Sequence, residues 1–455
     1  MKKIKIYTII LTLLAGLGSC EFGDTNVDPA KPLDVSMQAI MPALQTGLSF
    51  NLGGEYVLFS NILMQQLDGG STAQQGDWTR YVIDGQDTDI MWQNTYTNAL
   101  NMADIIVQKA QESNAPHYSG VAKVMMAAGL GVASDCFGDI PFTTAFEAEQ
   151  GVIPSYDTHQ EIYGDIQSLL DDAISDLSGD SPGGSPAGDD LIFGGDMDSW
   201  IAAAWALKAR YFLHESNIRG NAAYTDVLNA IANAFSSNSG NMQQMFGTVA
   251  NEPNPRYEFN LNRPNNVLMG AYFINKLTDK NDPRLANLNG VTGRFYTSID
   301  SPVPYITFAE VKLIEAEALL MTGGDLADVK AALLAGVTAS VVEVTENVAS
   351  ETANAEYIAN LDAAFDALTT DEERLGLIIN EKYVITVSTT VESWVDFRRT
   401  GYPDDITPNP QGNTAANPGG GIPRRLPYPD NEITLNNNIP FTEINMQLRL
   451  FWDTP

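Results

Sequence analysis

The sequence predicts an all-α-dominated protein built as a helical solenoid of the tetratricopeptide type. Many segments carry apolar residues at three- and four-residue spacing, which is typical of amphipathic helices. Several are rich in alanine, such as the segment with Ala202, Ala203, Ala206 and Ala209, so neighbouring helices can approach closely. Long polar segments dense in glycine, proline, asparagine and aspartate lie between the helices. No strict repeat of about 34 residues is visible, so any repeats are degenerate.

The expected helices follow one another along most of the chain. In order, they cover residues 39–52, 98–112, 118–135, 159–177, 199–216, 308–322, 355–368 and 371–387. The polar segments between them are 68–90, 179–198, 237–266, 281–304 and 400–440. Structureless segments of this length are usually disordered or functional. The stretch 178–190 has the composition of a flexible connector.

The N-terminus has the pattern of a secretion signal. Lys2, Lys3 and Lys5 form a basic region, and residues 6–14 form an apolar region too short to span a bilayer. Leu17-Gly18-Ser19-Cys20 resembles the bacterial lipobox, in which cleavage leaves a lipid-modified cysteine at the N-terminus. We therefore expect residues 1–19 to be a signal peptide, Cys20 to be the lipid anchor and residues 20–34 to be a tether. An ordinary signal peptide with an incidental cysteine is the alternative.

Charge and cysteine content narrow the possible partners. The formal net charge of the 455 residues is −32, and such a surface repels nucleic acid and anionic lipid headgroups. We therefore expect no nucleic-acid partner.

Cys136 has no second cysteine in the mature chain, so we expect no internal disulfide and interpret Cys136 as a small buried apolar residue.

Enzyme and metal signatures are sparse. The chain has no H-E-x-x-H, no P-loop motif and no G-x-S-x-G elbow. The histidines His117, His159 and His214 lie far apart, without metal-ligand spacing, and the acidic loop 84–89 lacks the spacing of a known calcium loop. Glu310, Glu315 and Glu317 are expected on the solvated face of a helix. We therefore expect no catalytic residues, no metal and no cofactor; a surface glycoside hydrolase using two carboxylates is the enzyme alternative.

Two polar segments offer stacking surface for a sugar ring, whose apolar face packs on aromatic rings while its hydroxyls bind polar side chains. They are 68–87 and 251–266. The ligand-binding candidates are Asp77, Trp78, Arg80 and Tyr81 in the first segment, and Arg256, Tyr257, Asn262 and Arg263 in the second. For Trp78, capping of the core remains the alternative to ligand contact.

The other tryptophans fit core packing better. Trp92 is expected to begin a helix, and Trp200 and Trp205 share the alanine-rich helix. Near Trp394, the pair Arg398 and Arg399 is expected to satisfy helix-end carbonyls and nearby carboxylates, with a ligand clamp as the alternative.

A set of motifs in a fixed order resembles the SusD/RagB family of nutrient-binding lipoproteins. The resemblance covers essentially the whole mature chain and is closest to the SusD-like branch that carries AGVTAS (335–340). The motifs are SDCFGDIPFTTAFE (134–147), SWIAAAWALKARYFLHE (199–215), KNDPRL (280–285), PYITFAEVKLIEAEALL (304–320), IINEKYV (378–384), ESWVDFRRTGYP (392–403) and IPRRLPYPDNE (422–432).

The resemblance implies a surface-exposed lipoprotein of the Gram-negative outer membrane. It implies four tetratricopeptide-like helix pairs packed against a loop-rich ligand-binding half, so that residues 35–455 form one domain with discontinuous halves. Glu21 and Asp24 suit the acidic export signal of such lipoproteins. Ligand contacts in relatives tend to come from the loop corresponding to 68–90 and from the stretch before PYITFAE.

The resemblance also implies a function. Family members capture a glycan, or in some cases a peptide, and act as the lid of a SusC-like TonB-dependent transporter. We therefore expect a non-catalytic oligosaccharide-binding protein, with peptide binding as the alternative. A third interpretation is a structural scaffold that binds only another protein.

Overall fold

The computed structural model describes residues 35–454 except 72, 148–150, 250, 289–297, 347–350, 388, 390 and 441–444. The expected signal peptide, the tether and Cys20 lie outside the described residues. The helices of the first half are α2 (Met37–Asn51), η1 (Leu52–Tyr56), α3 (Val57–Leu63), α4 (Gln74–Thr79), α5 (Gly85–Thr95), η2 (Tyr96–Leu100), α6 (Asn101–Ser113), α7 (Pro116–Phe137), α8 (His159–Leu177), α9 (Met197–His214), α10 (Ser216–Arg219) and α11 (Asn221–Ile231).

Helices also dominate the second half. They are η4 (Asn238–Gly240), α12 (Pro255–Asn262), α13 (Ala271–Asp279), α14 (Leu285–Leu288), α15 (Phe308–Met321), α16 (Leu326–Thr345), α17 (Thr352–Ala367), α18 (Asp371–Ile385), α19 (Glu392–Thr400) and α20 (Asp430–Leu435). The strands within the described residues are β1 (Leu67–Gly69), β2 (Met242–Gln244), β3 (Val267–Met269) and β4 (Val303–Ile306).

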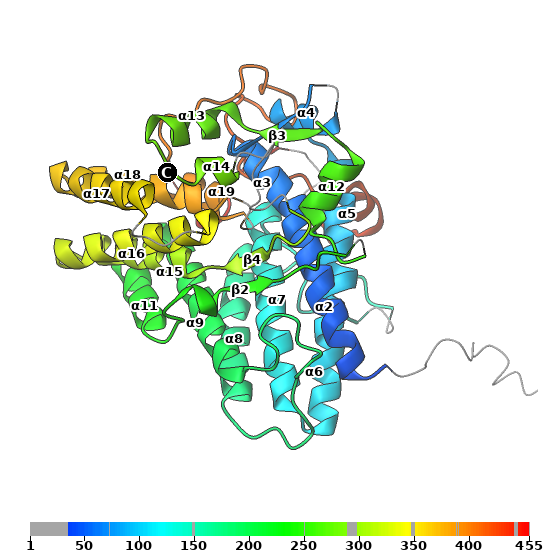
Figure 1. The fold of residues 1–455 in the computed structure, drawn as a ribbon. Helices are drawn as coiled ribbons and strands as arrows, with labels where there is room; N and C mark the ends of the chain where they lie inside the picture. Colours follow the sequence, from blue (N-terminus) through cyan, green and yellow to red (C-terminus); the bar gives the residue numbers. More distant parts are fainter. Residues whose placement is uncertain are drawn as a thin grey trace, which may run out of the picture.

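The long helices form a curved row, so the predicted all-α-dominated solenoid is confirmed. Each helix of the row packs on the next one in the order α6, α7, α8, α9, α11, α15, α16 and α17 (Figure 1). The shorter helices α3, α4, α12, α13 and α14 gather at the upper end of the molecule in Figure 1, together with β1 and β3. The irregular half of the fold is therefore built from segments of both chain halves.

Helix α7, the second helix of this row, packs between α6 and α8. By length and composition it could cross a membrane, but 94% of its apolar window is buried by the rest of the protein, as in the core helix of a globular domain. A Cβ on Gly131 would lie 2.0 Å from Tyr211 Oη, so only glycine allows α9 to come this close. Cys136, on the same helix, is a buried free thiol, as the sequence predicted.

Local caps explain where the long helices begin. Thr158 and Glu161 form a capping box at the start of α8, and Thr370 and Glu373 form one at the start of α18. These pairs satisfy backbone N–H groups that have no partner within the first helical turn.

Several polar segments are more ordered than expected. The segment 68–90 contains α4 and the beginning of α5, and 237–266 contains β2 and α12. Trp92 lies in the middle of α5, which begins at the Asp84 cap, rather than at a helix start. It is part of the core, as expected.

The flexible connector expected at 178–190 is instead tied to the helices at both ends. Gly183 N donates to the Asn114 carbonyl at 2.7 Å. The buried Asp190 accepts hydrogen bonds from Gln45 Nε2 at 2.8 Å and from Trp200 Nε1 at 2.7 Å. The composition of this segment therefore reflects turns rather than a free linker.

The expected solvated face on α15 is wrong for two of its three glutamates. Glu310 and Glu317 are fully buried, and only Glu315 is partly exposed. Arg210 donates to both oxygens of Glu310 at 2.8 and 2.7 Å. Arg399 Nη2 donates to Glu317 Oε2 at 2.8 Å. Two buried arginines, one on α9 and one on α19, hold these carboxylates inside the protein.

Arg398 and Arg399 behave as the sequence predicted. Arg398 Nη1 donates to the Asp135 carbonyl in the last turn of α7 at 2.7 Å, and its guanidinium stacks 3.8 Å from the Trp394 ring. Arg399 binds the carboxylates of Glu317 and Asp396. Both arginines therefore join α19 to other helices.

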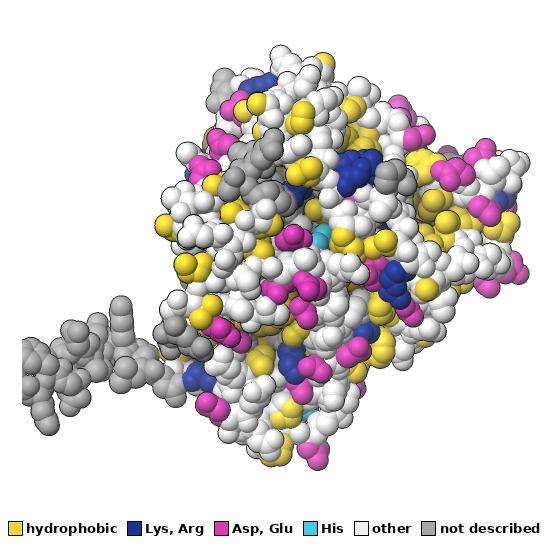
Figure 2. Space-filling model, turned by 180° about the vertical axis from the view of Figure 1, so that it is seen from behind, with side chains coloured by type: hydrophobic (Ala, Val, Ile, Leu, Met, Phe, Trp, Pro, Cys, Tyr) yellow, Lys and Arg dark blue, Asp and Glu magenta, His cyan; other side chains and the backbone are white. Residues whose placement is uncertain are grey.

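Acidic side chains are scattered over the face shown in Figure 2, among uncharged and hydrophobic ones. Basic side chains are fewer on this face, in keeping with the net charge of −32.

Candidate functional site

The two candidate ligand segments lie side by side because β1 pairs with β3. The pairing is antiparallel, with Leu67 opposite Met269 and Gly69 opposite Val267. Gly70 N extends it by donating to the Asn266 carbonyl at 2.7 Å. A Cβ on Gly69 would lie 1.9 Å from the Gln75 carbonyl oxygen, so β1 and α4 can pack this closely only with glycine there.

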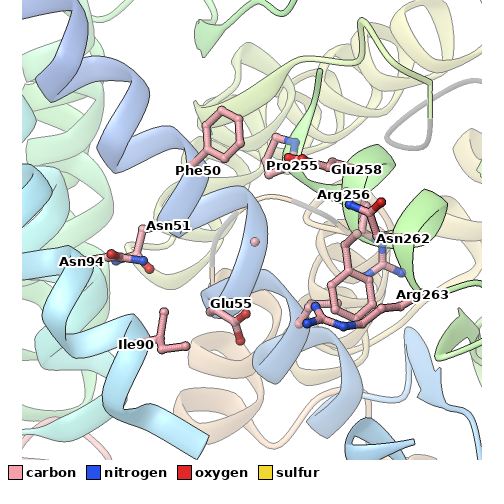
Figure 3. A pocket seen from close by; sticks show the side chains of 13 residues that line it. Phe50, Asn51, Glu55, Ile90, Asn94, Pro255, Arg256, Glu258, Asn262 and Arg263 are labelled. Atoms are coloured by element: carbon pink, nitrogen blue, oxygen red, sulfur yellow. The ribbon is translucent and has the colours of Figure 1, made fainter. Parts of the chain in front are cut away.

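A hollow of about 250 Å³ is lined by α12, the helix that precedes β3 in the chain, and we call it the α12 hollow. Its walls come from α12, from α2 and η1, and from α5 (Figure 3). The lining residues are Phe50, Asn51, Gly54, Glu55, Leu58, Ile90, Asn94, Pro255, Arg256, Glu258, Phe259, Asn262 and Arg263.

Two local features shape the hollow. The Asn254 side chain caps α12 by accepting hydrogen bonds from Arg256 N and Tyr257 N, and Pro255 occupies the first turn. Opposite, α2 continues into the π-helical turn η1, which carries Glu55. Turns of this type are rare and often occur at functional sites, because the extra residue redirects the side chains.

Two buried polar atoms in the hollow have no hydrogen-bond partner among the described residues. They are Asn51 Oδ1 and Arg256 Nη1, and these side chains belong to residues that are 2% and 8% exposed. Burial lowers the pKa of Arg256 to about 10, and no carboxylate opposes this shift. Unsatisfied buried groups are costly in a folded protein and call for an explanation.

Glu55 adds a titratable acid to the same wall. Burial raises the pKa of Glu55, while the nearby Arg263 guanidinium lowers it and Asp87 raises it. Glu55 and Arg263 project into the hollow from opposite walls (Figure 3).

Aromatic rings complete the lining. Phe50 and Phe259 both face the hollow, and the Arg263 guanidinium lies 5.4 Å from the Phe259 ring centroid. Apolar rings beside amides, carboxylates and guanidinium groups can pack on the C–H face of a sugar and bind its hydroxyls.

Three of the four candidates in 251–266 line this hollow: Arg256, Asn262 and Arg263. Tyr257 is half-buried and is not among the lining residues.

The candidates in the first segment lie elsewhere. Trp78 is 2% exposed and stacks on Phe59 with ring centroids 4.0 Å apart, which fits the core alternative. Tyr81 is also buried, and its hydroxyl accepts a hydrogen bond from Asn409 N. Asp77 and Arg80 form a surface ion pair with each other at 2.5 Å. Tyr81 lines a separate hollow of about 320 Å³ together with Asp68, Thr79 and Tyr272.

Sequence reasoning missed the wall formed by α2, η1 and α5. Phe50, Asn51 and Glu55 lie at the end of an expected helix, where nothing in the spacing marks a break. Ile90 is 62% exposed on α5, and an exposed isoleucine carries no signal in a sequence alone.

One buried cluster brings together groups that the sequence places far apart. Asp135, His214 and Glu392 offer ligand atoms within 4.8 Å of one another. His214 Nε2 lies 2.9 Å from Glu392 Oε2, and its Nδ1 lies 2.8 Å from Tyr163 Oη. Burial opposes the charged imidazolium, but Glu392 and Asp135 outweigh burial and raise the pKa of His214 to about 9. With Nε2 facing Glu392 and Nδ1 facing the Tyr163 hydroxyl, His214 is part of a buried hydrogen-bonded network.

Comparison with known proteins identifies the fold. The family model described as "Starch-binding associating with outer membrane" (SusD-like) matches residues 29–294 and 288–429. A SusD/RagB family protein from Bacteroides thetaiotaomicron is 22% identical, with a TM-score of 0.78 over 92% of this chain and 99% of that chain.

Two further solved structures are similar. A chitin-binding SusD homologue from Flavobacterium johnsoniae is 20% identical, with a TM-score of 0.75 over 92% of this chain and 98% of that one. A SusD homologue from Bacteroides fragilis is 20% identical, with a TM-score of 0.71 over 91% and 100%. No curated protein matches the chain. Since the family model covers most of the sequence, the chain belongs to the SusD-like family of outer-membrane-associated binding proteins.

Proposed function

We propose that this protein captures an oligosaccharide in the α12 hollow and delivers it to a SusC-like TonB-dependent transporter in the outer membrane. The observation that carries the proposal is a pair of buried polar atoms without partners in the described part of the chain. They are Asn51 Oδ1 and Arg256 Nη1, and their residues line a hollow flanked by phenylalanine rings. Sugar hydroxyls both donate and accept hydrogen bonds, so one ligand can satisfy both atoms once local motion opens a path to them.

The family supports the cellular setting of this proposal. Its description names starch binding and association with the outer membrane. We propose that Cys20 is the lipid anchor that displays the protein at the cell surface, and that its partner is the barrel transporter. A binding protein without catalytic residues is sufficient for this role.

Isothermal titration with neutral oligosaccharides of several linkages tests glycan capture. Phe259→Ala removes a ring of the hollow, and we expect it to weaken binding about tenfold, because one lost apolar contact of this size corresponds to roughly that factor. Leu261→Ala is the matched control, because Leu261 lies on the same helix, is 64% exposed and is not part of the lining. Equal affinities for the two variants would remove the α12 hollow from the proposal.

The same titration with peptide digests separates the ligand classes. Binding of peptides but of no glycan would replace the oligosaccharide by a peptide in the same uptake system. Release of new reducing ends from a polysaccharide by the purified protein would instead support a hydrolase. Co-purification with a barrel transporter checks the partner.

A further inference from the structure

A second and larger hollow lies on the other side of α5. It has a volume of about 550 Å³ and is enclosed by α5, η2, α20 and the chain around Pro141 and Pro154; we call it the α20 hollow. Helix α5 separates the two hollows, since Ile90 and Asn94 face the α12 hollow while Asp89 and Gln93 face the α20 hollow. Each pair is spaced by four residues and therefore shares one helix face.

The floor of the α20 hollow is aromatic and held rigidly. Trp92 and Tyr96 line it, with their ring centroids 5.0 Å apart. Behind them, Tyr428 packs edge-on against Trp92 at 6.0 Å. The Tyr96 hydroxyl donates to the Pro141 carbonyl at 2.8 Å, which fixes the ring. On the opposite wall, the side chain of Leu435 is 72% exposed and adds an apolar surface to the hollow.

The rim of the hollow is polar and acidic. Asp89 and Glu432 are both among the lining residues, and no lysine or arginine is found among the described residues that line it. Glu432 Oε2 accepts a hydrogen bond from the Tyr156 hydroxyl at 2.9 Å, and Asp89 Oδ1 accepts one from Asn431 N at 3.4 Å. These bonds hold the two carboxylates in place while each keeps further acceptor capacity.

We propose that the α20 hollow is a second ligand site and that it takes a cationic amino sugar. The apolar face of the ring packs on Tyr96 and Leu435, and the ammonium group is held by the carboxylates of Asp89 and Glu432. Two carboxylates, with no lysine or arginine among the described residues that line the hollow, favour a positively charged ring over a neutral one and disfavour a uronic acid. The α12 hollow differs in this respect, because Arg256 and Arg263 line it. The second site is therefore independent of the proposed function at the first.

Titration of the mature protein with three sugars of equal length tests the charge preference. The probes are the glucosamine trisaccharide, its fully N-acetylated form and a galacturonate trisaccharide, used at a pH where the amine is protonated. We expect affinity to fall in that order, by about tenfold at the first step.

Substitutions at Leu435 assign the binding to the hollow. Leu435→Arg and Leu435→Gln both remove the exposed leucine, but only arginine adds a positive charge at the rim. We expect the arginine variant to weaken glucosamine binding about tenfold or more, and the glutamine variant by no more than about threefold. Because Leu435 is exposed, both variants should fold, and circular dichroism checks this.

Two aspartate substitutions, one in the hollow and one outside it, provide the second control. Asp89→Asn keeps the acceptor for Asn431 N but removes the charge, and Asp328→Asn removes an exposed charge from α16, far from the hollow in sequence. Unaltered binding in Leu435→Arg, or equal losses in the two aspartate variants, would show that the anionic surface attracts the sugar non-specifically and would overturn the proposal. Equal binding of a trilysine peptide would overturn the assignment to a sugar. Loss of glucosamine binding in the α12-hollow variant Phe259→Ala, with unaltered binding in both Leu435 variants, would place the sugar in the α12 hollow and overturn the proposal.

Discussion

Replacement of Trp78 by alanine is expected to destabilise the fold by about 3–5 kcal/mol, the usual cost of truncating a buried tryptophan. The reason is the stacked contact with Phe59 and an exposed fraction of 2%. Urea unfolding followed by circular dichroism measures the loss, and Trp78→Phe, which keeps a ring, should lose less. A variant that unfolds like the wild type but no longer binds glycan would return Trp78 to the ligand site.

The composition around Trp78 could not distinguish the two roles. Glycine and glutamine neighbours predict a loop, and a tryptophan in a loop is free to contact a ligand. The structure folds these residues into α4 and turns the indole onto Phe59, which lies in a different helix. Arg256, Asn262 and Arg263, which line the α12 hollow, were candidates in the sequence because an aromatic, arginine-containing segment is unusual for a linker. Asn51 could not be found, since its importance is the missing hydrogen bond and not its residue type.

At the scale of single elements, α15 provides a matched comparison. Glu317→Ala leaves Arg399 with one carboxylate fewer in a buried setting, and we expect a loss of about 3–5 kcal/mol in the free energy of unfolding. Glu315→Ala, two residues away, breaks a pair with Lys312 that is still partly exposed and should cost at most about 1 kcal/mol. Chemical denaturation of both variants checks the difference, and equal effects would contradict a buried role for Glu317.

The long helices were predictable because their periodicity extends over many turns, as in α8, whose bounds match the expected 159–177. Glu310 and Glu317 of α15 were misplaced because periodicity places charged residues on a solvated face, and only tertiary structure supplies buried arginines. Strands β1 and β3 are three residues long, too short to produce an alternating pattern. Their pairing, which brings the two candidate ligand segments together, therefore could not be predicted from the sequence.

At the scale of the whole molecule, the net charge and the proposed anchor act together. A chain with a formal charge of −32 has little affinity for an anionic membrane surface, so we expect its retention there to depend on the proposed lipid. Cys20→Ser is expected to move the protein from the membrane fraction to the soluble fraction without changing its unfolding temperature. Fractionation followed by immunoblotting measures this, and mass spectrometry of the wild-type N-terminus identifies the modification. A serine variant retained in the membrane would contradict anchoring through Cys20.

The antiparallel pairing of β1 and β3 also limits the order in which the protein can fold while it is being synthesised. Its partners, Leu67 and Met269, are about two hundred residues apart in the chain. A chain made from its N-terminus can begin to stack its early helices long before β3 exists, because contacts near in sequence form first. The wall supplied by α12 arrives only with residues 255–262. The proposed glycan capture would therefore be acquired late in synthesis, because a chain terminated before α12 lacks one wall of the hollow.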